Sequence, residues 1–112
     1  GNIDIDSDSA KLRLGDGQDF EVYSNGLHSF IDSNTGDLRL LGDDLKLMRT
    51  DGSTYYIDCN AGGAVELFHN NVKMIETTNA GAITYGLHQI TGAEGGYISM
   101  LMKEMMLPIN GE

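Results

Sequence analysis

Apolar and polar residues alternate in short bursts along this chain. Each burst places two apolar side chains two positions apart, and residues that favour turns follow. A period of two is that of a β-strand with one buried face, whereas a helix would repeat every three to four residues. The pattern therefore predicts short strands, at Leu12/Leu14, Phe20/Val22, Leu38/Leu40, Leu45/Leu47, Val65/Leu67 and Val72/Met74.

Glycine, asparagine and aspartate separate these bursts. The separators are Gly15-Asp16-Gly17, Asn25-Gly26, Thr35-Gly36, Asp51-Gly52, Gly62-Gly63 and Asn70-Asn71. Asn-Gly and Asp-Gly favour the type I′ turns that join antiparallel strands. Glycine accounts for 15 of the 112 residues, about twice its ordinary share, and it reaches positive φ at no steric cost. We therefore expect an all-β fold of repeated short strands joined by Gly/Asn/Asp turns.

The sequence repeats itself with a period of about 26 residues. Residues 11–14 return as residues 37–40, and residues 30–36 return as residues 56–62, both at a shift of 26. Repeats of this kind are one supersecondary unit in tandem. Each copy corresponds to about three short strands.

The shift between matching residues changes by one position between these blocks. Residues 20–22 correspond to residues 45–47 at a shift of 25, whereas residues 24–26 correspond to residues 50–52 at a shift of 26. A third and weaker copy begins at Val65. The chain thus divides into an acidic leader (1–10), a repeated β module (11–91) and a Met-rich C-terminal segment (92–112).

The apolar content is low for a domain that folds alone. Hydrophobic residue types make up 40% of the chain, and tryptophan is absent. Strand repeats with so little apolar mass bury their faces by stacking on their neighbours or on another chain. Partner chains would also cover the exposed strand edges, and closed symmetry favours identical partners. We therefore expect a homo-oligomer with an elongated β-solenoid or β-prism-like form.

The C-terminal segment differs from the repeats. Residues 92–96 resemble a connector, and the stretch that follows holds four of the six methionines. A strand is expected at 97–102, while 103–107 fits either a strand or a helix. Methionine-rich apolar surface of this kind favours an oligomer contact, so the segment is a candidate tip, cap or joint.

The charge excludes several partners. The formal net charge is −10, with only seven Lys and Arg residues, which argues against nucleic acid and against anionic membrane surfaces. No apolar run approaches about 18 residues, so no membrane insertion is expected. No signal peptide is expected either, and the single Cys59 excludes an intrachain disulfide.

Two acidic motifs have the outline of Ca²⁺ sites. Asp4-Ile5-Asp6-Ser7-Asp8 lacks the glycine and glutamate that an EF-hand loop requires. Gly15-Asp16-Gly17-Gln18-Asp19 fits a calcium β-roll repeat only in part and does not recur in tandem. The three histidines, His28, His69 and His88, lack metal spacing, although one per chain could meet on a three-fold axis. We therefore expect no cofactor. We interpret the first motif as part of a solvated acidic leader and the second as a glycine-bearing turn.

Catalytic patterns are equally weak. Ser99 and Lys103 are four apart, where the serine–lysine signature needs three, and Cys59 is expected in a turn with no histidine nearby. The pair Asp43-Asp44 could imitate a glycosidase pair, but 17 acidic residues make such pairs common by chance. We expect no catalytic, cofactor or metal residue and no enzyme activity. The candidates for glycan contact are Tyr23, Tyr55, Tyr56, Tyr85 and Tyr97.

The stretch from Leu12 to Gly26, LRLGDGQDFEVYSNG, resembles the signature LRLGDGQDFEIYHDG of tail fibre and other virion structural proteins of marine and related phages. Residues 63–78 are similar to the same family's NGAVELYYDNSKKFETT, and residues 80–86 resemble its close, GVTVTG. The resemblance covers about residues 11–86. His69 departs from the aromatic residue more usual there, and residues 87–112 match no part of the family.

This resemblance implies a trimeric, β-rich component of a tail fibre or related virion appendage, without enzyme activity. Such a protein gives a stiff shaft, contacts itself and other appendage proteins, and helps host attachment. Two alternatives remain open. One is a lectin-like tip that recognises a host surface glycan or receptor, and the weaker one is an appendage polysaccharide hydrolase.

Overall fold

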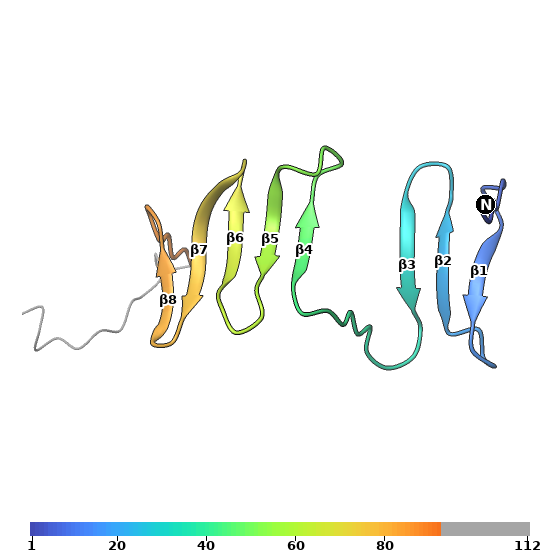
Figure 1. The fold of residues 1–112 in the computed structure, drawn as a ribbon, viewed down its shortest axis with the longest axis horizontal. Helices are drawn as coiled ribbons and strands as arrows, with labels where there is room; N and C mark the ends of the chain where they lie inside the picture. The colour runs from blue at the N-terminus through green and yellow to red at the C-terminus, as the bar shows by residue number, and fades with distance from the viewer. Residues whose placement is uncertain (93–112) are drawn as a thin grey trace, which may run out of the picture. The chain divides into compact units, whose positions relative to one another are not determined.

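The computed structural model describes residues 1–92, which contain eight strands and no helix (Figure 1). The prediction of an all-β fold is confirmed, as two antiparallel sheets. The chain divides into two compact units, Gly1–Gly42 and a second that begins at Asp43. The expected strand at 97–102 lies outside the described residues. No helix among the described residues is long and apolar enough to cross a membrane.

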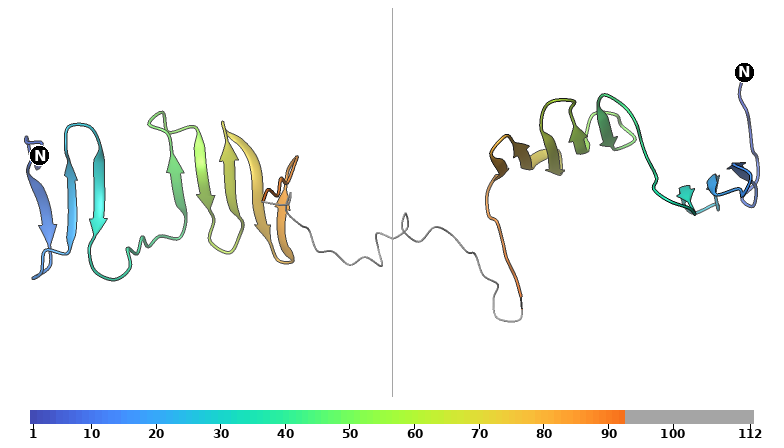
Figure 2. Two further views of the ribbon diagram at one scale, coloured as in Figure 1. Left: turned by 180° about the vertical axis from the view of Figure 1, so that it is seen from behind. Right: turned by 90° about the horizontal axis from the view of Figure 1, so that it is seen from below.

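The first unit holds a three-stranded meander in the order β1-β2-β3. Its strands are β1 (Lys11–Leu14), β2 (Phe20–Ser24) and β3 (Ser29–Ser33). The second unit holds a five-stranded meander in the order β4-β5-β6-β7-β8. Its strands are β4 (Leu45–Met48), β5 (Tyr55–Cys59), β6 (Val65–His69), β7 (Val72–Thr78) and β8 (Gly81–Thr84). Viewed along the strands, each sheet is a single layer (Figure 2).

One expected strand does not form. Residues 34–44, which include Leu38/Leu40, contain no strand. In the first copy, the five residues between β1 and β2 reverse the chain through positive φ angles at Gly15 (93°) and Gln18 (55°). The second copy has only the four residues 41–44 at this place, none with a positive φ. The missing residue removes the reversal that would bring residues 37–40 alongside β4.

The type I′ turns expected at the Asn-Gly and Asp-Gly dipeptides do not form, although Asn70-Asn71 has the backbone of one. Asn70 and Asn71 both have positive φ (47° and 64°), as a type I′ turn requires. At Asn25-Gly26 and Asp51-Gly52 only the glycine does, with φ of 86° and 70°. Neither dipeptide therefore forms the expected type I′ turn, because a side chain holds the reversal instead.

That side-chain device is the same in both copies. Asn25 Oδ1 accepts hydrogen bonds from the N–H groups of Leu27 (3.0 Å) and His28 (2.8 Å). Asp51 Oδ1 accepts them from Ser53 (2.9 Å) and Thr54 (3.2 Å). Side-chain oxygens of Asn and Asp commonly close a turn in this way. Positions 26 residues apart thus adopt the same local structure, as the repeat predicts.

The registers divide each sheet into two chemically different faces. Residues paired directly across antiparallel strands point to the same face. In the first sheet Leu12, Val22 and Ile31 form one row. In the second sheet the corresponding row is Leu47, Ile57, Leu67 and Ile75. We call these the apolar faces, and the opposite ones, which carry lysines and carboxylates, the charged faces.

Neither unit has a hydrophobic core of its own. Among the described residues no hydrophobic side chain is buried, and the one buried residue is Glu21, at 9% exposure. Leu12 and Ile31 remain 46% and 59% exposed on their apolar face. Because each unit has one layer, strand pairing and cross-strand contacts alone hold it together.

Candidate interaction surfaces

The charged face of the second sheet begins with an ion pair between β4 and β5. Lys46 Nζ donates a hydrogen bond to Asp58 Oδ1 at 2.6 Å, and the two residues are directly paired in register. The ammonium also lies 5.3 Å from the ring centroid of Tyr55. The hydrogen bond to Asp58 is the main cause that raises the pKa of Lys46 above its ordinary value. The pair therefore stabilises the charged form of Lys46.

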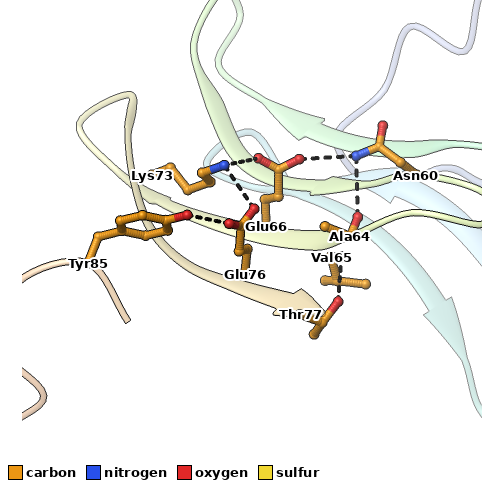
Figure 3. A network of polar contacts seen from close by, with 8 residues as sticks. All are labelled: Asn60, Ala64, Val65, Glu66, Lys73, Glu76, Thr77 and Tyr85. Atoms are coloured by element: carbon orange, nitrogen blue, oxygen red, sulfur yellow. Dashed lines mark hydrogen bonds and ion pairs between the residues drawn. The ribbon is translucent and has the colours of Figure 1, made fainter. Parts of the chain in front are cut away.

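A larger polar network follows on β6, β7 and the segment after β8 (Figure 3). Lys73 Nζ lies 2.9 Å from Glu76 Oε2 and 3.4 Å from Glu66 Oε2. The Tyr85 hydroxyl donates a hydrogen bond to Glu76, and the Asn60 amide donates one to Glu66 at 3.3 Å. Glu66 and Glu76 face each other directly across the two strands. Like charges so placed repel, so the lysine between them is needed to neutralise the repulsion.

The pKa shifts in this network have one shared cause. The hydrogen bond from Lys73, and after it the one from Tyr85, lowers the pKa of Glu76. The hydrogen bond to Glu76 raises the pKa of Lys73 and, from the other side, that of Tyr85. These shifts widen the pH range over which the lysine is protonated and the carboxylate is ionised. A protonated lysine is no nucleophile, so the network has the chemistry of a cross-strand brace.

The charged face of the first sheet repeats this arrangement. Glu21 on β2 accepts a hydrogen bond from Lys11 and lies 3.3 Å from Nε of Arg13. The Lys11 ammonium is 4.1 Å from the ring centroid of Tyr23, which stacks on Phe30 at 4.6 Å. Lysine, carboxylate and aromatic ring thus recur as a unit on both sheets. Cation–π contact and ion pairing together satisfy each cation.

The apolar faces are the other candidate surfaces, and they carry no Asp, Glu, Lys or Arg. In the second sheet, Leu45, Cys59 and Val65 form a row beside the one already described. Their neighbours Leu47 and Leu67 are 44% and 39% exposed. The apolar residues are Leu12, Leu14, Phe20, Val22 and Ile31 on the first sheet, and Leu45, Leu47, Ile57, Cys59, Val65, Leu67 and Ile75 on the second.

The acidic motifs show no cation site. Asp4 and Asp6 line an open hollow together with Ile3 and Ile5 only. Asp8 lies against the turn at Gly26. Across residues 1–92, no three His, Cys, Asp or Glu side chains come close enough to hold a metal ion.

The histidines occupy separate places. His28 lies in the β2–β3 turn with its ring edge-on to Phe30 at 6.4 Å. His69 ends β6, and His88 Nδ1 lies 3.3 Å from Thr84 Oγ1. Within the second unit, His69 and His88 share no metal cluster.

Cys59 and the aspartate pair are placed differently from the expectation. Cys59 was expected in a turn, but it is the last residue of β5 and belongs to the apolar face. It is half-buried and not disulfide-bonded. Asp44 Oδ1 accepts a hydrogen bond from the N–H of Ala61 at 2.8 Å, so it closes a loop. Ser99 and Lys103 lie outside the described residues, as does Tyr97.

The four other tyrosines fall into two groups. Tyr23 and Tyr55 pack on the charged faces against Phe30 and Phe68. Tyr56 and Tyr85 are 52% and 39% exposed. The sequence predicted none of the lysine–carboxylate braces. The signal was present, because pairing the alternating strands as hairpins sets Lys11 and Arg13 against Glu21 on one face.

Comparisons with protein-family models, with curated proteins and with solved structures found no match to this chain. Its function is therefore inferred from its own sequence and geometry.

Proposed function

We propose that this chain is a non-catalytic structural module of a phage tail fibre or related virion appendage. It acts as a homotrimer with intertwined or side-by-side chains, in an elongated solenoid or prism-like form. One observation carries this proposal: the chain repeats a strand meander whose apolar side chains remain uncovered, with none buried among residues 1–92. A chain built in this way is completed by an assembly. The resemblance of residues 11–86 to virion structural proteins supplies the setting.

The work of such a module is mechanical. Cross-strand braces such as Lys46–Asp58 stiffen each sheet, and burial between chains supplies the stability that each single-layer sheet lacks. Closed rotational symmetry satisfies every copy with the same contact. The module contributes length and stiffness and contacts neighbouring appendage proteins, which helps host attachment.

Light scattering and thermal unfolding at several protein concentrations test this proposal. We expect a mass near three times 12.1 kDa and a melting temperature that rises with concentration, because association stabilises the folded chain by mass action. A well-folded monomer whose melting is independent of concentration would refute it.

A second candidate is a receptor-binding module for a host surface glycan. The exposed rings of Tyr56 and Tyr85 favour it, since aromatic side chains with a polar edge suit sugar faces. A glycan ligand that binds the native state would raise the melting temperature. Tyr56→Ala should abolish that shift and leave the mass unchanged.

A further inference from the structure

The apolar faces differ from every other surface of the two sheets in having no charge. The registers place Leu47, Ile57, Leu67 and Ile75 in one continuous row across four strands, with Leu45, Cys59 and Val65 beside it. The first sheet has the shorter row Leu12, Val22 and Ile31. Neither face is covered within its own unit.

We propose that the apolar faces are covered by the apolar faces of a second copy of this chain, while the charged faces remain in water. This inference rests on the proposed homo-oligomeric function and names the surface that joins the copies. It distinguishes the apolar faces from the two other surfaces that could join them, the charged faces and the strand edges.

The chain has a net charge of −10, so an interface between copies is least costly where it contains no charged side chain. Charged side chains in an interface bring like charges close together, which is costly. Only the apolar face can approach a second copy without placing a charge opposite a charge. The copy in turn offers rows of the same side chains at the same strand spacing, since both sheets derive from one repeat.

The charged faces are poor candidates for this contact because most of their charges are already paired. Lys73 is held by two carboxylates, and Glu21 by two cations. Packing a second copy over these pairs would remove them from water, and the cost of desolvating an ion pair often exceeds its Coulombic gain. The apolar face has no such cost.

The area of each apolar face decides how much of the chain a stable contact must use. With strands about 4.8 Å apart and residues about 3.3 Å apart, an apolar face over the four strands β4 to β7, five residues deep, measures about 320 Å², and the three-stranded one about 240 Å². The larger face alone lies within the roughly 300–600 Å² of the largest apolar patch on a typical monomer. A stable interface buries about 800 Å² per partner, so both faces are needed to approach it.

Cys59 provides a direct test because it is a thiol on the apolar face. Its neighbour Asp58 lies on the opposite, charged face of the same strand. We would measure the rate at which N-ethylmaleimide labels native Cys59 and, as a matched control, the thiol of the double variant Asp58→Cys, Cys59→Ser. In the assembled protein the native thiol should react at least about tenfold more slowly, because reaction awaits opening of the contact. Dilution to monomers should remove this protection.

The outcomes separate this inference from the proposed function. An assembled protein in which both thiols react equally fast would refute the apolar-face contact and leave the homo-oligomer intact. A monomeric wild type would refute the proposed function itself. A second pair, Leu47→Gln and Lys46→Gln, introduces the same residue on opposite faces. Loss of assembly with Leu47→Gln alone supports the inference, and loss with Lys46→Gln alone contradicts it.

Discussion

Truncating Leu67 to alanine tests how much of the chain's stability comes from association. Leu67 lies in the apolar row between Ile57 and Ile75, and 39% of it remains exposed in the single chain. Full burial of a leucine side chain contributes roughly 1.5–3 kcal/mol. The exposed fraction thus represents about 0.6–1.2 kcal/mol per copy that only a partner can supply. Over three copies, Leu67→Ala should cost about 2–3.5 kcal/mol of assembly free energy.

A loss of this size is readily measured. At tenfold per 1.4 kcal/mol, the association constant should fall roughly 30- to 300-fold, which sedimentation velocity over a dilution series detects. Leu27→Ala is the control, since Leu27 lies in the β2–β3 turn and is 84% exposed. Exposed substitutions of that kind stay within about 0.5 kcal/mol. If Leu67→Ala dissociates no more readily than Leu27→Ala, the reasoning about the apolar faces is wrong.

Three further predictions concern the braces and the turns. Lys73→Met should lower the urea midpoint of unfolding at neutral pH, because Glu66 and Glu76 then repel each other. The control Arg39→Met breaks only an exposed ion pair and should leave the midpoint unchanged. The lowered pKa of Glu76 means that its contribution is present above its unfolded pKa and is lost as the pH falls through its folded pKa. The deficit of Lys73→Met should therefore shrink in acid, and a deficit that is constant with pH would contradict the brace. Asn25→Ala removes the acceptor of two N–H groups and should cost about 1 kcal/mol in chemical unfolding, whereas Asn25→Asp should retain most of it. At Gly52 an added Cβ would meet no other atom, but the backbone has a φ of 70°. Gly52→Ala should therefore cost about 1–2 kcal/mol of unfolding free energy through backbone strain alone. Gly52→Asn should cost less, because asparagine adopts positive φ more readily than alanine.

The fold class was predictable because alternation is a local property. Seven of the eight strands contain or adjoin an alternating burst or a repeated block, and the 26-residue shift correctly equates the turns at Asn25 and Asp51. The strand at Leu38/Leu40 was predicted wrongly, since a one-residue deletion changes little in the alternation but removes a chain reversal. The turn type was missed for a similar reason. An Asn-Gly or Asp-Gly dipeptide predicts the positive φ of its glycine. The conformation of the Asn or Asp itself is decided by the hydrogen bonds that its side chain accepts.

The candidate surfaces were harder to predict from the sequence, because they depend on the register in which the strands pair. Whether Lys73 meets Glu66, Glu76 or neither follows from the irregular pairing between Leu67 and Phe68, which no spacing rule predicts. The bulge shifts one strand by a residue relative to its partner. A shift of one residue moves the following side chains of that strand to the opposite face of the sheet. The sequence predicted Cys59 in a turn that follows Ile57 and Asp58. Its pairing with Leu45 and Val65 shows that the strand continues one residue further.

The distribution of charge yields a last prediction, on salt. The two charged faces carry four cations (Lys11, Arg13, Lys46 and Lys73) against five carboxylates (Glu21, Asp32, Asp58, Glu66 and Glu76), a net charge of −1. The leader and the connecting segments carry nine aspartates against Arg39 and Arg49, a net charge of −7. The excess charge thus lies away from both faces.

If apolar faces join the copies, the remaining electrostatic force between copies is repulsion among these like-charged segments. Salt screens such exposed charges, with a Debye length that falls from about 30 Å at 0.01 M to about 8 Å at 0.15 M. The dissociation constant measured by sedimentation should therefore decrease as NaCl is raised over this range. Lys46→Gln makes each copy more acidic and should steepen that dependence. Contact through the charged faces predicts the opposite sign, because salt weakens attraction between complementary charges. A dissociation constant that rises with salt would thus contradict the apolar-face assembly without any variant being made.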